Sequence, residues 1–485
     1  MATPWHSETF ESRRLTHNRD DTRTRQDPPV SRPKRPVNRR TFLRTTLGAA
    51  AVTPLAGMAW KPYTGRGGKS EILRVASIGV GGMGWTDLRQ VASHPAVEIA
   101  ALCDVDSNNL GRAEELFPEA DTFADWRELF SKHGNTFDAV TISTPDHMHA
   151  PIAMTALMAN KSVYCQKPLT HTIYESRRLR EVASRKPIVA TQMGTQNASR
   201  DGKLQALAML KNGAIGELQA VHGWSDRPAG WWPQGEDRPA GSSPVPDYLD
   251  WNDWIGVAPM RPYKADTYAP FKWRGIRDFG CGALGDMACH ICDTPIQAFK
   301  LYTPTSVICE ATDATADMFP SSERVIVDFK GVKGSGGKPV KLYWTDGGRV
   351  PSPTELNIRA DYSLKQNTVA VVGSKGTLLV QPETGTPLLF ENGDPMDTVK
   401  LPDVPNQNHW HQWVDAAFYG NPTQSSFGFA GRMCETLSLG ALASRFPNQT
   451  LAYDSKSMTF PDFPEANKWV RTNYREGWAV EGLSS

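Results

Sequence analysis

The chain has 485 residues, of which 39% are hydrophobic and 22% charged, and its formal net charge is +1. This length allows two or three packed domains, and the composition argues against a bundle of membrane-spanning helices. Residues 1–44 carry 11 basic and 5 acidic side chains, which leaves 42 basic and 47 acidic ones in the remainder. A mildly acidic body argues against nucleic acid as a partner, because phosphate backbones bind basic surfaces.

The first 68 residues divide into a polar extension and a segment typical of an export signal. Residues 1–38 are polar and show no apolar periodicity, so we expect them to be disordered. In residues 39–68, Arg39 and Arg40 precede an uncharged apolar run that ends at Ala59, and this run is too short to span a bilayer well. The letters R-R-T-F-L resemble the twin-arginine (Tat) export signal. A basic tail with a chance arginine pair is the alternative.

From residue 69 the sequence changes to alternating strand and helix patterns. The run "ILRVASIGVGGMG" is rich in apolar residues and leads into Gly79, Gly81 and Gly84, with the spacing G-x-G-x-x-G. We expect Gly79 to permit a tight turn and Gly81 to let the backbone approach a pyrophosphate. Gly84 should let the next helix, over residues 85–93, pack close to the strand with its N-terminus facing the phosphates. A structural glycine turn in another α/β protein is the alternative.

A second strand pattern, "VEIAALCD", ends at Asp104, twenty residues after Gly84. A carboxylate at this place would accept hydrogen bonds from a ribose diol and repel a 2′-phosphate. The sequence therefore predicts NAD as the cofactor and disfavours NADP.

Further strands are predicted over residues 139–143, 162–165 and 188–192, with helices over 125–132 and 152–158 between them. Such alternation predicts an α/β fold, with a doubly wound parallel Rossmann sheet over residues 69–194. Ligands bind at the carboxyl ends of strands in these sheets. The loops "TPDHMHA" and "CQKPLTH" follow two of the strands there.

The rest of the chain, residues 195–485, predicts a second domain. Alternating strands over residues 305–310, 325–329, 340–345 and 368–372 indicate a largely antiparallel sheet in an α+β domain, and "GSKGTLLVQP" reads as a hairpin. The tail "EANKWVRTNYREGWAV" is predicted to be a closing helix, with the Rossmann domain as its expected packing surface.

Tryptophans concentrate at the start of this second domain. Six of the fifteen lie between Trp224 and Trp273, together with Arg227, Arg261 and Arg274. Aromatic faces stack on sugar rings and arginines donate to hydroxyls, so the group favours a carbohydrate-sized cleft. The alternative is that several of them fill core beneath long loops.

Seven cysteines form an odd count without dense spacing, so we expect mostly free thiols. Cys289 and Cys292 form a C-x-x-C pair around His290, with Cys281 upstream. A structural zinc site needs four ligands and no second pair accompanies this one, so no metal is predicted.

Several motifs together resemble the Gfo/Idh/MocA family, the oxidoreductases named after glucose-fructose oxidoreductase and inositol dehydrogenase. They are the glycine fingerprint, the T-P-x-H-x-H turn, the K-P dipeptide and "GALGDMACHICD". The resemblance implies that Lys167 is the active-site lysine beside nicotinamide and substrate, and that Asp286 and His290 form the family's D-x3-H pair. It also implies a homo-oligomer, a dimer or tetramer, formed through the sheet of the second domain.

The spacing of these residues makes chemical sense by itself. Asp286 and His290 are four residues apart and share one face of a helix, and an imidazole is well placed to take a hydroxyl proton near neutral pH. Lys167 would stabilise the developing alkoxide or share the proton transfer, and Asp286 would hold a substrate hydroxyl. A surface lysine and a solvated helix face are the alternatives. The family usually has E-K-P where this chain has Gln166, and a neutral amide does not stabilise an ammonium as a carboxylate would.

The predicted site residues form three overlapping sets, and the catalytic set is Lys167, Asp286 and His290. The substrate set is Trp232, Arg274, Asp286 and His290. The cofactor set is Gly79, Gly81, Gly82, Met83, Gly84, Asp104, Thr144, Pro145, His147, His149, Gln166 and Lys167. His409 and His411 are two apart and cannot share a helix face; one of them lines the cleft, or both belong to a helix start.

Three functions remain open at this point. The first is an NAD-dependent oxidoreductase acting on a sugar or polyol, the second is redox-neutral cleavage of a glycoside by oxidation, elimination and re-reduction, and the third is a non-catalytic sugar or nucleotide sensor. The Tat machinery accepts folded proteins, so export to the periplasm or another extracytoplasmic site, tethered to the membrane if the signal is uncleaved, is compatible with a bound cofactor. Outside the cytoplasm no NAD pool exists. We therefore expect the protein to hold NAD tightly and each catalytic cycle to return NAD to its starting oxidation state.

Overall fold

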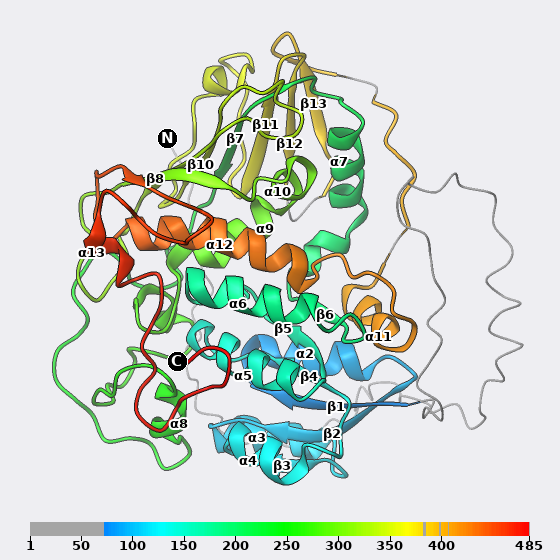
Figure 1. The fold of residues 1–485 in the computed structure, drawn as a ribbon, viewed down its shortest axis with the longest axis vertical. Helices are drawn as coiled ribbons and strands as arrows, with labels where there is room; N and C mark the ends of the chain where they lie inside the picture. Colours follow the sequence, from blue (N-terminus) through cyan, green and yellow to red (C-terminus); the bar gives the residue numbers. More distant parts are fainter. Residues whose placement is uncertain (1–71, 382–384, 397–398, 406, 485) are drawn as a thin grey trace, which may run out of the picture. The chain divides into compact units, whose positions relative to one another are not determined.

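The computed structural model describes residues 72–381, 385–396, 399–405 and 407–484. The polar extension and the twin-arginine segment, predicted over residues 1–68, lie outside the described residues. Within the described ranges, no helix combines the length and the apolar character needed to cross a bilayer. Figure 1 shows two sheets, one toward each end of the view, with helices α6 (Ile173–Ser184) and α12 (Phe427–Ala443) between them.

The first domain is a six-stranded parallel sheet with strand order β3-β2-β1-β4-β5-β6, as the Rossmann prediction required. The chain order reverses between β1 and β4, and the crevice at the carboxyl ends of these two strands is where such sheets bind ligands. The strands are β1 (Leu73–Ile78), β2 (Val97–Cys103), β3 (Asp121–Phe123), β4 (Ala139–Ile142), β5 (Ser162–Cys165) and β6 (Thr191–Met193). Besides α6, the connecting helices are α2 (Gly82–Ala92), α3 (Ser107–Leu116), α4 (Trp126–His133) and α5 (Asp146–Met158).

Local sequence signals explain where several of these helices begin. The Asp106 carboxylate accepts hydrogen bonds from two backbone N–H groups at the start of α3. Thr172 and Glu175 form a capping box at the start of α6. Helix α5 begins at Asp146, six residues before the predicted start, so the segment "TPDHMHA" is a loop only over its first two residues. This correction matters because it places His147 and His149 on a helix.

The second domain is built on a nine-stranded sheet with strand order β14-β13-β12-β11-β7-β10-β9-β8-β15. Neighbouring strands pair antiparallel except β7 and β10, which confirms the largely antiparallel prediction. The strands are β7 (Leu218–Trp224), β8 (Pro304–Glu310), β9 (Arg324–Phe329), β10 (Val340–Thr345), β11 (Thr368–Gly373), β12 (Thr377–Val380), β13 (Leu388–Glu391), β14 (Asp394–Pro395) and β15 (Leu451–Ala452).

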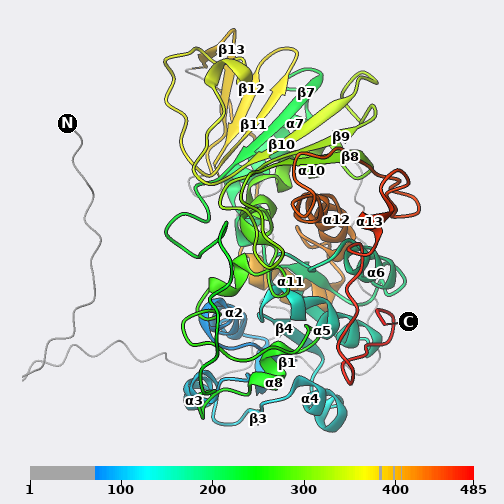
Figure 2. The ribbon, with the colours of Figure 1, turned by 90° about the vertical axis from the view of Figure 1, so that its left-hand side faces the viewer.

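One face of this sheet packs on helices that join it to the Rossmann domain. Helix α12 contacts β8 and β9 on one side and α6 on the other, while α7 (Asp201–Lys211) and α10 (Asp293–Phe299) pack together beside it. Figure 2 shows α10 and α12 on the side of the sheet that faces the first domain. One continuous cluster of buried apolar residues runs from the Rossmann strands through α12 to the second sheet. The two domains therefore share a core, which fixes the cleft between them.

Two predictions about the second domain need correction. Strand β7 lies inside the sheet, next to β10 and β11, yet no strand was predicted over its residues. The predicted closing helix ends after one turn, α13 (Pro464–Asn467). The remaining tail runs along the Rossmann domain, where Tyr474 donates a 2.7 Å hydrogen bond to Glu175. Because Trp478 and Val480 are both buried at a spacing of two, this part of the tail packs as extended chain rather than as a helix.

Candidate active site

A cavity of about 780 Å³ lies where the carboxyl ends of β1, β2 and β4 meet the tryptophan-rich loops of the second domain. Its wall on the Rossmann side includes Gly79, Gly81, Gly82, Met83, Asp104, Thr144, Pro145, Gln166 and Lys167. Its opposite wall includes Trp231, Trp232, Phe271, Trp273, Arg274, Asp286 and His290. Most of the predicted cofactor and substrate residues thus line one space, with Gly84, His147 and His149 outside its lining.

The glycine loop is closely packed where the fingerprint predicts it. Gly79 has a φ of +77°, which favours glycine, and a Cβ at Gly84 would lie 1.9 Å from the carbonyl oxygen of Gly79. Gly84 therefore allows α2 to approach β1. Gly82, with a φ of +50°, faces open space. Among the described residues, no side chain caps the N-terminus of α2 at Gly81, and the first turn of the helix has no acidic residue. The first backbone N–H groups of α2 can therefore bind an anion.

Asp104 lies at the end of β2, at the edge of the cavity, and has a role that the sequence did not suggest. One carboxylate oxygen accepts hydrogen bonds from the backbone N–H groups of Val80 (2.8 Å) and Gly81 (3.2 Å). The other accepts from the N–H of Asp106 at 2.9 Å. Burial raises the pKa of Asp104 to about 6, and these hydrogen bonds oppose the rise. Asp104 therefore braces the glycine loop and still has lone pairs for a ribose diol.

The residues present fit a nicotinamide dinucleotide. The close approach at Gly84 would be filled by any larger residue, the uncapped N-terminus of α2 suits a pyrophosphate, and the carboxylate of Asp104 suits a ribose. The fit supports NAD and disfavours a 2′-phosphate beside Asp104.

Lys167, Arg274 and Asp286 form a compact ion cluster on the cavity wall. Lys167 Nζ lies 2.5 Å from Asp286 Oδ1 and 3.0 Å from the Asp286 carbonyl oxygen. Arg274 Nε donates to the same Oδ1 at 2.9 Å. Burial would raise the pKa of Asp286, but the two neighbouring cations outweigh it and hold the pKa well below its usual range. Asp286 is therefore ionised. In this structure its carboxylate binds Lys167 and Arg274 and so positions the lysine, whereas the sequence predicted that it would hold a substrate hydroxyl.

His290 lies one turn beyond Asp286 and is only partly buried. Asp286 belongs to a short π-helix, Leu284–Ala288, and the wider turn still leaves both residues near one face. Burial and the charge of Lys167 lower the pKa of His290 to about 3, so the imidazole is neutral near pH 7. Its Nδ1 is sealed from solvent and has no hydrogen-bond partner in the described part of the chain. Nε2 is therefore the ring atom that can meet a substrate.

His147 and His149 do not line the cavity. Both side chains bond to backbone carbonyl oxygens near it. His147 Nε2 lies 3.1 Å from the carbonyl oxygen of Ile255. His149 lies 2.6 Å from the carbonyl oxygen of Pro168 and 2.8 Å from that of Thr144. A contribution of either imidazole to cofactor binding would thus be indirect, since His149 ties the loop that presents Lys167 to the end of β4.

The tryptophans divide between core and cavity. Trp224, at the end of β7, is fully buried, whereas Trp231, Trp232 and Trp273 line the cavity. Trp231 remains 52% exposed, with Arg227 stacked on it at 3.8 Å. Trp251 and Trp254, which also line the cavity, stack on each other, and Arg261 pairs with Asp278 outside it. Both alternatives of the sequence analysis are therefore partly right.

His409, His411 and the cysteines lie away from the chemistry. Ser199 and a backbone carbonyl engage His409, and His411 contacts Ser93, so both belong to the start of α11 (His409–Tyr419). All seven cysteines are buried free thiols, which confirms that prediction. Among the described residues, no group of three His, Cys, Asp or Glu side chains is placed to hold a metal ion.

Sequence reasoning missed Asp87, a fully buried carboxylate on α2 beneath the cavity. It accepts hydrogen bonds from Ser143 Oγ (2.8 Å), Gln166 Nε2 (2.7 Å) and Trp410 Nε1 (2.8 Å). Burial raises its pKa, and the three donors oppose the rise. The signal in the sequence was an acid on the apolar face of a helix, at the spacing of Gly84, Leu88 and Val91. Asp87 also explains why a neutral amide stands before Lys167.

Replacing Gln166 with Glu should test whether the buried Asp87 requires a neutral amide at position 166. The new carboxylate would meet Asp87 at hydrogen-bond distance, and two such groups can stay close only by sharing a proton. We expect the variant to lose turnover roughly 10-fold at about pH 8 and much less at about pH 6, because the shared proton is lost as the pH rises. The measurement is kcat against pH for the variant and the wild type.

The double variant Q166E/D87N is the matched control for this experiment. An amide at position 87 can donate to the new carboxylate and still accept from Trp410, which reverses the original hydrogen bond. It should recover most of the activity at high pH. A single Gln166→Glu variant with an unchanged pH profile would refute the role given to Asp87.

The fold and the site are those of a two-domain protein that can bind a nicotinamide dinucleotide. Residues 73–193 match the model of the Gfo/Idh/MocA oxidoreductase family for its NAD-binding Rossmann fold. Residues 229–333 match the model for the C-terminal α/β domain of the same family. The Rossmann domain and part of the second domain are thus both similar to the Gfo/Idh/MocA oxidoreductase family.

Curated relatives include a glycosyl hydrolase family 109 protein of a Shewanella species, 29% identical over 211 residues, and an alpha-N-acetylgalactosaminidase of Shewanella oneidensis, 30% identical over 211 residues. These matches cover 39% of this chain and 45% of each relative, so the chain spans about half the length of the curated relatives it matches.

Solved structures of similar fold cover more of the chain. An aldose-aldose oxidoreductase from Caulobacter crescentus has a TM-score of 0.53 at 15% identity, over 79% of this chain and 99% of that one. A levoglucosan dehydrogenase in complex with NADH and levoglucosan has a TM-score of 0.52 at 18% identity, over 78% and 99%. At these identities the likeness concerns the fold.

Proposed function

We propose that the chain is an NAD-dependent oxidoreductase that acts on a CH–OH carbon of a sugar or polyol. The observation that carries this proposal is the placement of the Lys167–Asp286–Arg274 cluster and a neutral His290 in the same cavity as the glycine loop. A sensor would need the loop and the aromatic wall, but it would have no use for a base and a paired lysine beside them.

In this proposal each residue has one task. Bound NAD supplies the hydride acceptor. The lowered pKa keeps the imidazole of His290 neutral, and with its one proton on Nδ1 the ring accepts the proton of the substrate hydroxyl on Nε2. Lys167 Nζ donates to the developing alkoxide, and Asp286 holds the lysine in position. The aromatic rings of Trp232 and Trp273 limit the access of water and offer apolar faces to a sugar ring.

A second candidate function is redox-neutral cleavage of a glycoside, and the glycosyl hydrolase family 109 relatives favour it. Oxidation of one ring carbon makes the hydrogen on the neighbouring carbon acidic. A base removes that proton, the glycosidic C–O bond breaks with its electron pair, and the leaving oxygen takes a proton. Water then adds to the double bond and the carbonyl is reduced again, so no cofactor is consumed.

We also propose that the protein is exported in folded form by the twin-arginine route to an extracytoplasmic compartment and holds NAD tightly there. Three separate parts of the cavity, namely the loop, the helix N-terminus and Asp104, must release the dinucleotide together. A homo-oligomer formed through the outer face of the second sheet is part of the same proposal.

Product analysis in deuterated water separates the two candidate reactions. The mature protein is purified without added nucleotide, dialysed, assayed for bound NAD and then incubated with sugars, polyols and glycosides. A dehydrogenase gives an oxidised product without solvent deuterium on carbon. The redox-neutral route gives a cleaved glycoside with deuterium on the carbon next to the oxidised one. Unchanged substrates throughout the panel, with NAD bound, would favour a sensor and contradict both candidates.

A further inference from the structure

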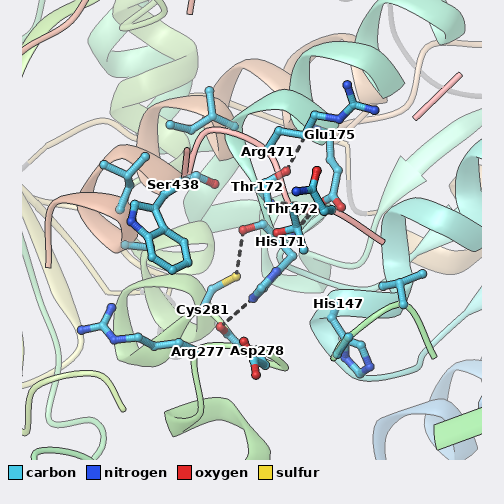
Figure 3. Close-up of a pocket in the computed structure, with 18 of the residues that line it drawn as sticks. His147, His171, Thr172, Glu175, Arg277, Asp278, Cys281, Ser438, Arg471 and Thr472 are labelled. Carbon is cyan, nitrogen blue, oxygen red and sulfur yellow. Dashed lines mark hydrogen bonds between the residues drawn. The ribbon is translucent and has the colours of Figure 1, made fainter. Parts of the chain in front are cut away.

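Figure 3 shows a second cavity, of about 250 Å³, with His171, Cys281 and Arg277 in its wall. It shares no lining residue with the larger cavity. His171, which follows the Lys167 loop, contributes to its wall, and so does Cys281, which precedes the helix of Asp286. His171 Nε2 lies 3.1 Å from the carbonyl oxygen of Gly280, so the two loops touch each other at this place.

Cations gather around this cavity. Arg277, Arg445, Lys468 and Arg471 line it. Arg445 stacks on the ring of Trp469 at 3.6 Å, and Lys468 Nζ lies 5.2 Å from the centre of the same ring. Within the described part of the chain, the side chains of Arg445 and Lys468 form no ion pair and no hydrogen bond. Their N–H groups are therefore available to a ligand.

Arg277 adds a buried charge to the wall. Its guanidinium donates to the carbonyl oxygens of Thr315 and Met318 and to both oxygens of Ser444, but forms no ion pair with a described carboxylate. Burial, together with the positive charge of Arg445, lowers its pKa to about 9, and the charge of the buried Glu323 only partly opposes this shift. A buried cation held by neutral groups is costly, and a nearby anion offsets that cost.

The acidic groups of the cavity are committed elsewhere. Glu175 accepts hydrogen bonds from the backbone N–H groups of His171 and Thr172 and from the hydroxyl of Tyr474. Asp278 is paired with Arg261. The cavity therefore keeps a positive surplus, and the hydroxyls of Ser438 and Thr472 add donors to its wall.

We propose that this cavity binds a small anionic ligand that carries a phosphate or carboxylate group. Arg445 and Lys468 donate to the anionic group, and Arg277 contributes its charge from below. Because the ligand would sit against the contact between His171 and Gly280, it occupies a site separate from the substrate and next to the loops of Lys167 and Asp286. The site goes beyond the proposed reaction and does not depend on it.

The test is calorimetric titration of the NAD-loaded protein with inorganic phosphate and, separately, with succinate. An excess of NAD keeps phosphate away from the glycine loop, and sodium chloride holds the ionic strength constant. We expect saturable binding of at least one anion to the wild type. The double variant R445Q/K468Q should weaken it at least about 10-fold, since two charge-assisted hydrogen bonds are lost.

Arg432→Gln is the matched control, because Arg432, which lies on α12, likewise faces an aromatic ring, that of Tyr302, but is outside the cavity. It should bind the anion like the wild type, and both variants should keep the wild-type melting temperature without anion to within a few degrees. Equal binding in R445Q/K468Q, or no saturable binding to the wild type, would overturn the proposal whatever the enzyme's activity proves to be.

Discussion

Lys167→Ala is expected to lower kcat roughly 10²-fold or more, while bound NAD stays at the wild-type level. Lys167 Nζ is the cation that Asp286 holds at 2.5 Å on the cavity wall that also carries His290. Removing it takes away the donor to the developing alkoxide and leaves Asp286 with Arg274 alone. The measurement is turnover on the best substrate together with the NAD content of the purified variant.

His290→Ala is expected to have an effect of the same order, because it removes the group that accepts the hydroxyl proton. The wild-type enzyme, at saturating NAD, should keep its kcat from about pH 8 to about pH 5, where an unshifted histidine would lose it. The sign follows from the lowered pKa: the imidazole gains its inactivating proton only near pH 3. His409→Ala, a buried histidine of α11 away from the cavity, is the control for general damage to the fold. Near-normal turnover in Lys167→Ala or His290→Ala would refute the role of that residue.

Gly84→Ala is expected to weaken NAD retention more than about 10-fold, because a Cβ there would lie 1.9 Å from the Gly79 carbonyl oxygen. Helix α2 would have to move away from β1, and its first N–H groups would move with it. We also expect a lower melting temperature, since the clash is with backbone. The measurements are bound NAD after dialysis and thermal unfolding with and without added NAD.

Gly111→Ala is the matched control for this variant. Gly111 lies inside helix α3, and nothing stands within 4 Å of the place where its Cβ would be. This substitution should be neutral or stabilise the fold by roughly 0.5–1 kcal/mol. A Gly84→Ala protein that keeps NAD like the wild type would contradict the packing role of that glycine.

The Rossmann half of the fold could be predicted because its strands are short apolar runs bounded by glycines and polar turns. The second domain was harder to predict. The residues of β7 include His222 and Gly223, and the strand is specified mainly by its neighbours β10 and β11. The early start of α5 had a local signal in Asp146 directly after Pro145, which was overlooked. The tail had a helical composition, but its contacts with the Rossmann domain decided its conformation.

In the candidate site, too, some residues could be predicted from local sequence and others depend on contacts between distant parts of the chain. Glycine spacing and family resemblance placed Lys167, Asp286 and His290 in one site, and the structure places them around one cavity. The bond between Arg274 and Asp286 and the hydrogen bond between Trp410 and Asp87 join distant parts of the chain. No local pattern encodes such pairs, so they become visible only when the chain is folded.

The most direct test of the proposed chemistry is rapid mixing of the NAD-loaded protein with a panel of sugars, polyols and glycosides, while the absorbance of reduced nicotinamide is followed. Both candidate reactions predict that at least one of these carbohydrates reduces the bound cofactor. Deuterium on the reacting CH–OH carbon should slow the reduction, and Lys167→Ala should abolish the rapid phase. A cofactor that stays oxidised with every carbohydrate, in protein shown to hold NAD, would contradict the assignment of this site to hydride transfer.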